Sequence, residues 1–176
     1  MKYRLLFFIL ILPQFLFAQT DAKYLAGAVP LVNGKVEFKK KFQVPHLSEG
    51  EIYDSFLAWA KERFTGEISR VVYTDKEKGE IVAIAQEYLV FQSTFLSLDR
   101  SLTQYKVTAI IKGDICEVTL NGFRYEYKLA NQDKPEILLP EELITDEHAL
   151  NKKKTKLARR TGKFRRATID LIDDLT

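Results

Sequence analysis

Residues that build metal centres and disulfides are scarce in this sequence. It contains one cysteine, Cys116, and two histidines, His46 and His148, which together show no metal-ligand spacing. A single cysteine cannot form an internal disulfide, so the core must be held together by burial alone. Cys116 alternates with Val118 and Leu120 on the apolar side of an expected strand, which favours a buried structural thiol. We therefore expect no bound metal or cofactor.

The short motifs that mark common enzymes are also missing. The chain has no glycine-rich phosphate loop and no G-x-S-x-G nucleophile motif. Carboxylates are paired at three places, Glu49 with Glu51, Glu141 with Glu142, and Asp146 with Glu147. Each pair lies in a polar loop or at an expected helix start, where the helix dipole favours negative charge. The sequence therefore indicates no catalytic residue.

Long hydrophobic runs are absent except near the start of the chain. Residues 5–17 are largely apolar, follow the positively charged stretch Met1–Arg4, and end before Ala18. This is the pattern of a cleaved signal peptide, and the run is shorter than the roughly 20 residues of a spanning helix. We expect residues 1–18 to be removed and residues 19–32 to form an N-terminal leader. The protein would then be exported, to the periplasm or out of the cell.

Charge nearly balances over the whole chain, at +3, but it is unevenly distributed. An acidic body is followed by residues 151–166, which contain nine basic side chains and no acidic one. They are Lys152, Lys153, Lys154, Lys156, Arg159, Arg160, Lys163, Arg165 and Arg166. Such a segment can bind the phosphates of nucleic acid, lipid or lipopolysaccharide. The commoner role of a charge run is a solvated helix face, which here could pair with the acidic body.

One stretch has the pattern of a long amphipathic helix. Ser48 and Glu51 have the spacing of a capping box, and Thr65-Gly66 supplies a stop signal. The apolar residues between these signals fall on one arc of the helix. They are Ile52, Tyr53, Phe56, Leu57, Trp59, Ala60 and Phe64. We interpret the arc as core packed on a sheet, not as a ligand-binding stripe, so Trp59→Ala should cost about 3–5 kcal/mol of stability.

Five stretches alternate in polarity or are rich in β-branched and aromatic residues, which predicts strands. They cover residues 35–44, 69–74, 80–91, 102–111 and 115–127. Turns are expected at Gly79 and Gly113, and a bulge at Gly122, where the parity of the apolar residues changes. Lys40 interrupts the apolar face of the first strand, and residues 92–101 are expected to form a loop or crossing segment.

Aromatic residues on these strands could stack on bases or sugars, although core packing explains most of them. They are Tyr73, Phe91, Tyr105, Phe123, Tyr125 and Tyr127. After the domain at residues 33–128, residues 129–145 form an expected linker with two prolines. Residues 146–176 then hold a second amphipathic helix, running from about Asp146 to Leu175 and including the basic segment. The order β-α-β-β-β-β-α predicts an α+β fold of two layers, with a mostly antiparallel sheet and both helices on one face.

Four segments together resemble a known bacterial family. They are G-K-V-E-F-K-K-K-F-Q-V-P (34–45), I-Y-D-S-F-L-A-W-A-K-E-R-F (52–64), S-R-V-V-Y-T-D-K-E-K-G-E-I-V-A (69–83) and Y-K-V-T-A-I-I-K-G-D-I-C-E-V-T-L (105–120). The family is the exported domain of unknown function number 4468, described as having a TBP-like fold. The resemblance covers roughly residues 30–128 and implies the same order of strands and helices. It implies no activity, because a shared shape does not define a function.

The sequence favours an exported, non-enzymatic binding or interaction module of the cell envelope. The contact would be made through the open sheet face or the basic segment, with an unidentified protein or envelope component, and a membrane surface is compatible. Two alternatives stay open: a binder of anionic surfaces or nucleic acid through the basic segment, and an enzyme with an unrecognised site on the polar sheet face. Export makes nucleic acid the less expected partner. Oligomeric state is not indicated.

Overall fold

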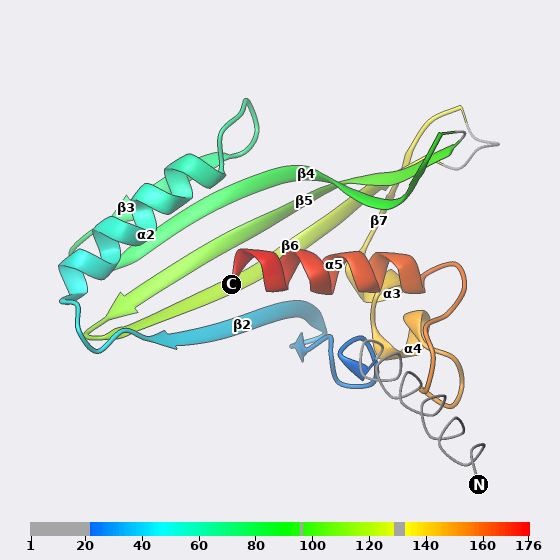
Figure 1. The fold of residues 1–176 in the computed structure, drawn as a ribbon, viewed down its shortest axis with the longest axis horizontal. Helices are drawn as coiled ribbons and strands as arrows, with labels where there is room; N and C mark the ends of the chain where they lie inside the picture. The colour runs from blue at the N-terminus through cyan, green and yellow to red at the C-terminus, as the bar shows by residue number, and fades with distance from the viewer. Residues whose placement is uncertain (1–21, 96, 129–132) are drawn as a thin grey trace, which may run out of the picture.

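The body of the protein is one antiparallel sheet with helices packed on it. The computed structural model describes residues 22–95, 97–128 and 133–176, so the expected signal peptide lies outside the described residues. The strands are β1 (Leu31–Val32), β2 (Lys35–Gln43), β3 (Arg70–Asp75), β4 (Glu80–Thr94), β5 (Ser97–Lys112), β6 (Ile115–Tyr127) and β7 (Glu136–Leu138). They are arranged in the order β1-β2-β6-β5-β4-β3, with β7 paired to β6 (Figure 1).

Four helices are described: α2 (Glu49–Arg63), α3 (Pro140–Leu143), α4 (Asp146–Ala149) and α5 (Gly162–Leu175). The two longer ones, α2 and α5, lie on the same face of the sheet, because residues of both line one pocket together with the inward side chains Cys116 and Val118 of β6. The α+β class, the antiparallel sheet and the single covered face are therefore confirmed. Among the described residues, no helix combines the length and apolar character that a membrane crossing requires.

The start of α2 follows directly from its local sequence. Ser48 Oγ accepts a hydrogen bond from Glu51 N at 3.4 Å, and the Glu51 carboxylate accepts one from Ser48 N at 2.8 Å. This is the predicted capping box. The Glu49 carboxylate also accepts from Gly113 N at 2.7 Å, which joins the first turn of the helix to the β5–β6 turn. Local sequence thus fixes where α2 begins, and Glu49 helps fix where it sits.

The predicted bulge in β6 is present at Gly122. Gly122 has a φ of +67°, and the pairing of β5 with β6 changes register between Gln104 and Lys106. The extra residue restores the alternation, so Leu120, before the bulge, and Phe123, after it, are both buried. Without the shift, the second half of β6 would direct its aromatic rings to solvent.

The helix-covered face explains the lysine that interrupts β2. Lys40 lies on the same side of the strand as buried Val36 and Phe38. Its ammonium reaches Asp173 of α5, with Nζ 3.3 Å from Oδ1. The same helix packs Phe164 on the ring of Tyr125, with centroids 5.6 Å apart. An ion pair and aromatic packing therefore hold α5 on the sheet.

Three segment boundaries differ from the sequence-based expectation. Residues 92–101 are not a crossing segment, because β4 and β5 continue as a hairpin in which Thr94 pairs with Ser97. The expected linker at 129–145 contains β7 and α3 among its described residues. The expected leader contributes to the core among its described residues, since Tyr24 and Val29 are buried. These segments lack strong periodicity, so only their tertiary partners define them.

The C-terminal helix is also shorter than predicted. The helical pattern expected from Asp146 to Leu175 is broken into α4, an irregular stretch at residues 150–161, and α5. Leu150 and Leu157, whose spacing of seven suggested a helical stripe, instead form an isolated antiparallel β-bridge. A spacing of seven fits two helical turns, but it also fits two residues that face each other across a tight turn.

Candidate functional site

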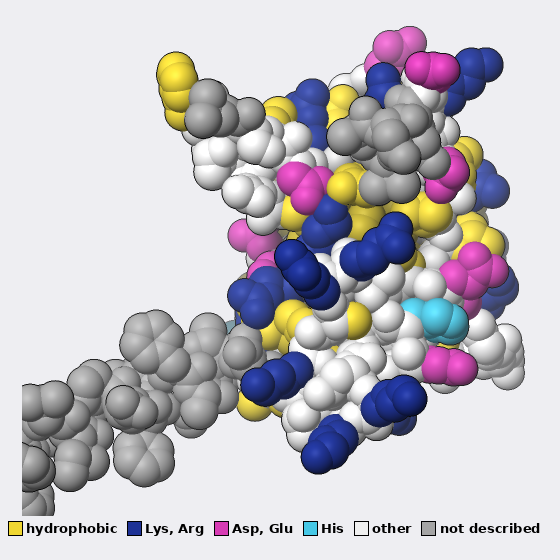
Figure 2. Space-filling view, turned by 90° about the vertical axis from the view of Figure 1, so that its right-hand side faces the viewer, with side chains coloured by type: hydrophobic (Ala, Val, Ile, Leu, Met, Phe, Trp, Pro, Cys, Tyr) yellow, Lys and Arg dark blue, Asp and Glu magenta, His cyan; other side chains and the backbone are white. Residues whose placement is uncertain are grey.

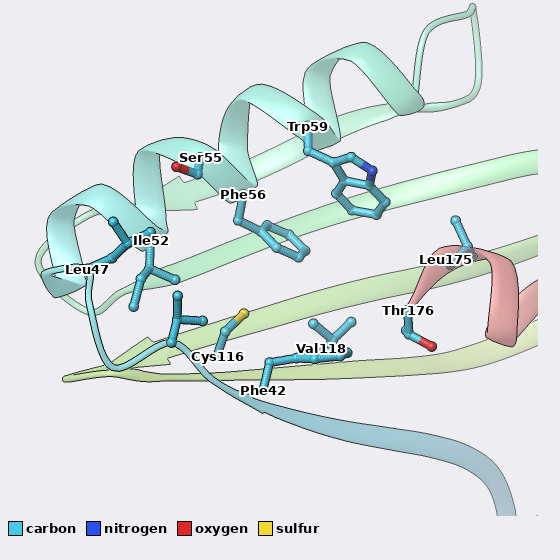
Figure 3. A pocket seen from close by; sticks show the side chains of 11 residues that line it. Phe42, Leu47, Ile52, Ser55, Phe56, Trp59, Cys116, Val118, Leu175 and Thr176 are labelled. Carbon is cyan, nitrogen blue, oxygen red and sulfur yellow. The ribbon is translucent and has the colours of Figure 1, made fainter.

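An apolar groove lies between α2 and the end of α5, above β2 and β6 (Figure 3). Its volume is about 370 Å³. Phe56 and Trp59 of α2 form one wall, Phe42 of β2 and Val118 of β6 form the floor, and Leu175 of α5 lies opposite. None of the lining side chains in the described part of the chain is charged. The groove can therefore accommodate an apolar group, and the side chains of its described lining offer no carboxylate, imidazole or amine for acid–base chemistry.

The groove changes the interpretation of the aromatic arc on α2. Ile52, Tyr53, Ala60 and Phe64 are buried as predicted, but Phe56, Leu57 and Trp59 are only partly buried. The Trp59 ring lies 5.1 Å from the Phe56 ring and 5.6 Å from the Phe64 ring, measured between centroids. Phe56 and Trp59 therefore pack against the core, as expected for the arc, but their rings remain partly exposed beside the groove.

Cys116 lies beside the groove as a buried thiol. Its side chain belongs to the groove lining, yet the residue is only 5% exposed. Burial raises the pKa of the Cys116 thiol, which lowers the fraction of reactive thiolate. The prediction of a buried, unreactive cysteine on an apolar strand face agrees with this position.

A second candidate surface is the basic loop, which we define as residues 150–161 between α4 and α5. Asn151 organises it: Asn151 Oδ1 accepts from Thr155 N at 2.9 Å, and Asn151 N donates to Lys156 O at 2.9 Å. Lys154 has a φ of +54°, a left-handed conformation that is uncommon for a residue with a side chain. The loop is thus a tight, hydrogen-bonded turn and not an extension of a helix.

Six of the nine predicted basic residues are presented by this loop. They are Lys152, Lys153, Lys154, Lys156, Arg159 and Arg160, and all six are exposed. Within the described ranges, none of them forms an ion pair within 4.0 Å, whereas several lysines of the body, such as Lys41 and Lys76, pair with acidic side chains. Figure 2 shows Lys and Arg side chains spread over this end of the molecule. Among the described residues, the structure therefore shows no ion pair between the loop cations and the acidic body.

Arg165 has a different place from the exposed loop cations. It is fully buried, and its Nε donates to Tyr24 O at 2.6 Å. Its other nitrogens donate to Leu25 O at 2.5 Å, to Ile144 O at 2.8 Å and to the Asp146 carboxylate at 2.7 Å. Arg165 thus joins the N-terminal segment, α4 and α5 in the interior. It does not belong to the surface that could bind an anion.

Asp146 is the acidic partner of this network. Burial acts to raise the pKa of the Asp146 carboxyl, but hydrogen bonds from Gly27 N and from Arg165 outweigh burial and lower it. Asp146 is therefore held in its charged form. Asp146 and Glu147 are adjacent carboxylates in the sequence, but only Asp146 has this structural role, because Glu147 is exposed.

Lys163 is partly buried in a cluster at the start of α5. Its Nζ lies 2.6 Å from Asp99 Oδ2 and 2.7 Å from the Tyr127 hydroxyl. The rings of Phe91 and Tyr127 lie 4.9 and 4.5 Å from the same nitrogen, at cation–π distance. Burial acts to lower the pKa of Lys163, but its hydrogen bonds to Asp99 and Tyr127 raise it overall. Arg166 is exposed and lies over the Tyr24 ring, with Cζ 4.9 Å from the ring centroid.

The remaining predicted polar residues have local structural roles or are exposed. Glu141 accepts from Val36 N at 3.0 Å, and His148 Nδ1 lies 2.9 Å from Thr145 Oγ1. His46 is exposed in the turn before α2. The described residues contain no group of three His, Cys, Asp or Glu side chains that could hold a metal ion.

The sheet face opposite the helices carries mixed polar and apolar side chains. Lys39 and Lys41 pair with Glu117, and the Glu37 carboxylate accepts from Asn121 at 3.0 Å. At the β3–β4 turn, hydrogen bonds from Lys78 lower the pKa of Asp75 to about 2. Five of the six predicted strand aromatics are buried or partly buried on the helix-covered side, and Tyr73 is the exposed exception at 42%.

Comparison with known proteins assigns the chain to a family. The sequence model of the domain of unknown function DUF4468, described as having a TBP-like fold, matches residues 38–126. The chain belongs to this family. A solved DUF4468 family protein from Bacteroides ovatus is 44% identical and has a TM-score of 0.81, over 87% of this chain and 88% of its own. A TBP-like protein from Parabacteroides distasonis, 23% identical with a TM-score of 0.71 over 84% and 91% of the two chains, shares the fold.

The DUF4468 likeness extends beyond the residues that the family model matches. The Bacteroides ovatus structure covers 87% of this chain, more than residues 38–126 alone. This agrees with the packing, because buried Tyr24 lies before that range and buried Phe164 after it. No curated protein matches the chain.

Sequence reasoning missed two features of this DUF4468 protein. The first is the groove, because periodicity identifies an apolar arc but not how far its partner covers it. The second is the tip of the β4–β5 hairpin, where Phe95 is fully exposed. A signal for the tip is present in the sequence, since three apolar residues, Phe95, Leu96 and Leu98, lie within the stretch expected to form a loop or crossing segment.

Proposed function

We propose that this DUF4468 protein is an exported, non-enzymatic binding module that attaches to an anionic component of the cell envelope through its basic loop. The observation that carries the proposal is the set of six exposed cations with no ion pair among the described residues. Body lysines with nearby carboxylates, such as Lys41 and Lys76, are compensated within the protein. Cations without such partners can interact with phosphate groups outside it.

The geometry of the loop supports this role. The hydrogen bonds of Asn151 and the bridge between Leu150 and Leu157 hold the turn, so the consecutive lysines 152–154 project from a fixed backbone. A preorganised loop loses less conformational entropy on binding than an extended flexible tail. Lys163 and Arg165 fix the chain immediately after the loop, through Asp99 and Asp146. The segment 151–166 thus combines two structural cations, Lys163 and Arg165, with seven that are exposed, the six of the loop and Arg166.

Export is the second part of the proposal and rests on the signal pattern of residues 1–18. The test is to express the complete sequence in a bacterial host and to determine the N-terminus of the purified product by mass spectrometry. We expect a chain that starts near Gln19 and is recovered from the periplasm or membrane fraction. An unprocessed chain in the cytoplasm would contradict export.

Attachment through the basic loop is tested with two triple variants of equal charge change. The loop variant is Lys152→Gln, Lys153→Gln and Lys154→Gln. The control is Lys61→Gln, Lys106→Gln and Lys112→Gln, which are also exposed and form no ion pair within 4.0 Å among the described residues. On immobilised heparin, used as a polyanion probe, the loop variant should elute at clearly lower salt than the processed wild-type protein, and the control close to it. Equal elution of both variants would overturn the proposal.

The open sheet face provides no comparable observation for an enzyme. Its carboxyl groups with a lowered pKa are Glu37 and Asp75, and the main cause in each case is a hydrogen bond from a neighbour, Asn121 or Lys78. Shifts of this kind stabilise local pairs, whereas a general acid usually has a raised pKa. We therefore place the function at the basic end.

A further inference from the structure

The tip of the β4–β5 hairpin is an apolar projection of the sheet. The described β5 residues before Leu102 pair with β4 alone, because the pairing of β5 with β6 begins at Leu102. A register shift between Val90 and Gln92 interrupts the pairing where this two-stranded part begins. At its end, Phe95 is 101% exposed and Leu98 is 55% exposed. A single exposed apolar residue is common on protein surfaces, but two large ones exposed within four positions at one hairpin tip are more typical of a contact surface.

The tip and the basic loop lie at the same end of the molecule (Figure 1). Asp99, at the base of the hairpin, binds Lys163, which follows the loop by two residues. Gln92 of the hairpin and Arg159 and Arg160 of the loop line one common pocket of about 590 Å³. The folded core thus holds the base of the hairpin next to the loop cations, and the apolar tip projects from the same end of the molecule.

We infer that this end docks on an anionic lipid bilayer, with the loop cations at the phosphate groups and Phe95 inserted at the boundary between headgroups and acyl chains. This inference rests on the proposed function, because it names the envelope component that the basic loop would bind. Charge complementarity favours a phosphate-bearing surface, and the exposed aromatic tip favours a surface with an apolar layer beneath the phosphates. A soluble polyanion would satisfy the cations but would leave Phe95 in water.

The composition of the tip fits such a docking. Residues 92–98 contain no charged residue, so insertion would carry no charge into the apolar layer. The ring of Phe95 supplies apolar area, and the nearby cations would lie at the depth of the phosphates. Stable membrane association typically needs two such weak contributions, here the insertion of an apolar side chain and the attraction of cations to the phosphates.

The first experiment compares vesicles with a soluble polyanion. Processed protein is titrated with vesicles of phosphatidylglycerol and phosphatidylcholine in equal parts, and separately applied to heparin. We expect Phe95→Ser to weaken vesicle binding about tenfold and to leave heparin elution unchanged. The control is Val72→Ser on β3, a strand beneath α2 at the opposite end, where a 47% exposed valine should be replaceable without effect (Figure 1).

The second experiment reports the depth of the tip directly. Phe95→Trp in a Trp59→Phe background places one tryptophan at the tip, and its emission should shift to shorter wavelength when vesicles are added. Vesicle binding without this shift, or with unchanged affinity for Phe95→Ser, would overturn the insertion of the tip and leave the proposed function standing. If the loop lysines retained the protein on heparin but no vesicles were bound, bilayer docking would likewise be overturned and the proposed function would stand. Loss of the loop dependence on heparin would overturn the proposed function itself.

Discussion

The groove beneath α2 and the basic end differ in how their side chains are held. At the groove, Phe56 and Trp59 pack against each other and remain partly open to solvent. At the basic end, Arg165 is fully enclosed, and three backbone carbonyls and Asp146 accept its hydrogen bonds. Removing a partly buried ring at the groove costs only the apolar contacts of that ring. A buried charged network instead fails as a whole, because one missing partner leaves the others unsatisfied.

The largest effect is expected from breaking the buried network. Arg165→Met should reduce the free energy of unfolding by about 3–5 kcal/mol, because it removes the cationic partner of Asp146 and three hydrogen bonds to buried backbone carbonyls. Chemical denaturation measures the change. Arg160→Met, one of the exposed loop residues, is the matched control and should cost less than about 0.5 kcal/mol. Similar losses for both variants would mean that the two positions are equally structural.

A smaller loss is expected at the groove. Trp59→Ala should destabilise the protein by about 2 kcal/mol, below the 3–5 kcal/mol expected for a fully buried ring, because the indole is only partly covered. Trp59→Phe should retain most of the stability by preserving the contact with Phe56. If Trp59→Ala cost as much as Arg165→Met, the groove would be closed in solution and the contrast between the two ends would disappear.

Acid should weaken the basic end through Asp146. Its pKa is lower in the folded protein than in the unfolded chain, so the stabilisation is present above the unfolded value of about 3.9 and is lost as pH falls through the folded value. Asp146→Asn should therefore be less stable than wild type at neutral pH, and the difference should shrink below about pH 4. Denaturation midpoints measured across this range test it. A difference that grew with acid would mean that the folded pKa of Asp146 is raised.

The smallest expected change concerns Cys116. Its thiol should react with iodoacetamide at mildly alkaline pH at least about tenfold more slowly than a free cysteine, because burial raises its pKa and limits access. Phe56→Ala should widen the groove and accelerate the reaction, whereas Phe42→Leu should change it less. Unfolded protein in denaturant supplies the reference rate. A fast reaction in the wild-type protein would show that the floor of the groove opens readily.

Much of the fold was predictable because its signals are local. The capping box at Ser48, the turns at Gly79 and Gly113, and the parity change at Gly122 each concern neighbouring residues, and all four are confirmed. The failures occurred where local pattern is ambiguous. Leu150 and Leu157 fitted a helix by spacing, but they bridge a turn. The stretch around Phe95 fits a loop or crossing segment by its sequence, but pairing between β4 and β5 makes it a hairpin.

For the basic segment, the sequence predicted the cations but not which of them are exposed, because burial depends on tertiary partners. Composition identified a segment with nine cations but could not separate the exposed Lys152 from the buried Arg165. That separation depends on where α4 and the N-terminal segment supply acceptors, which are distant in sequence.

By itself, the sequence determined the family, the sheet with its long α2 helix, and the concentration of positive charge near residue 160. Periodicity, caps and turns act over a few residues, so they can be identified without knowing the fold. Tertiary structure alone decided which cations become structural, which aromatic rings stay partly open in the groove, and which apolar residue projects at the hairpin tip. Those outcomes depend on which surfaces meet, and that is a property of the folded chain as a whole.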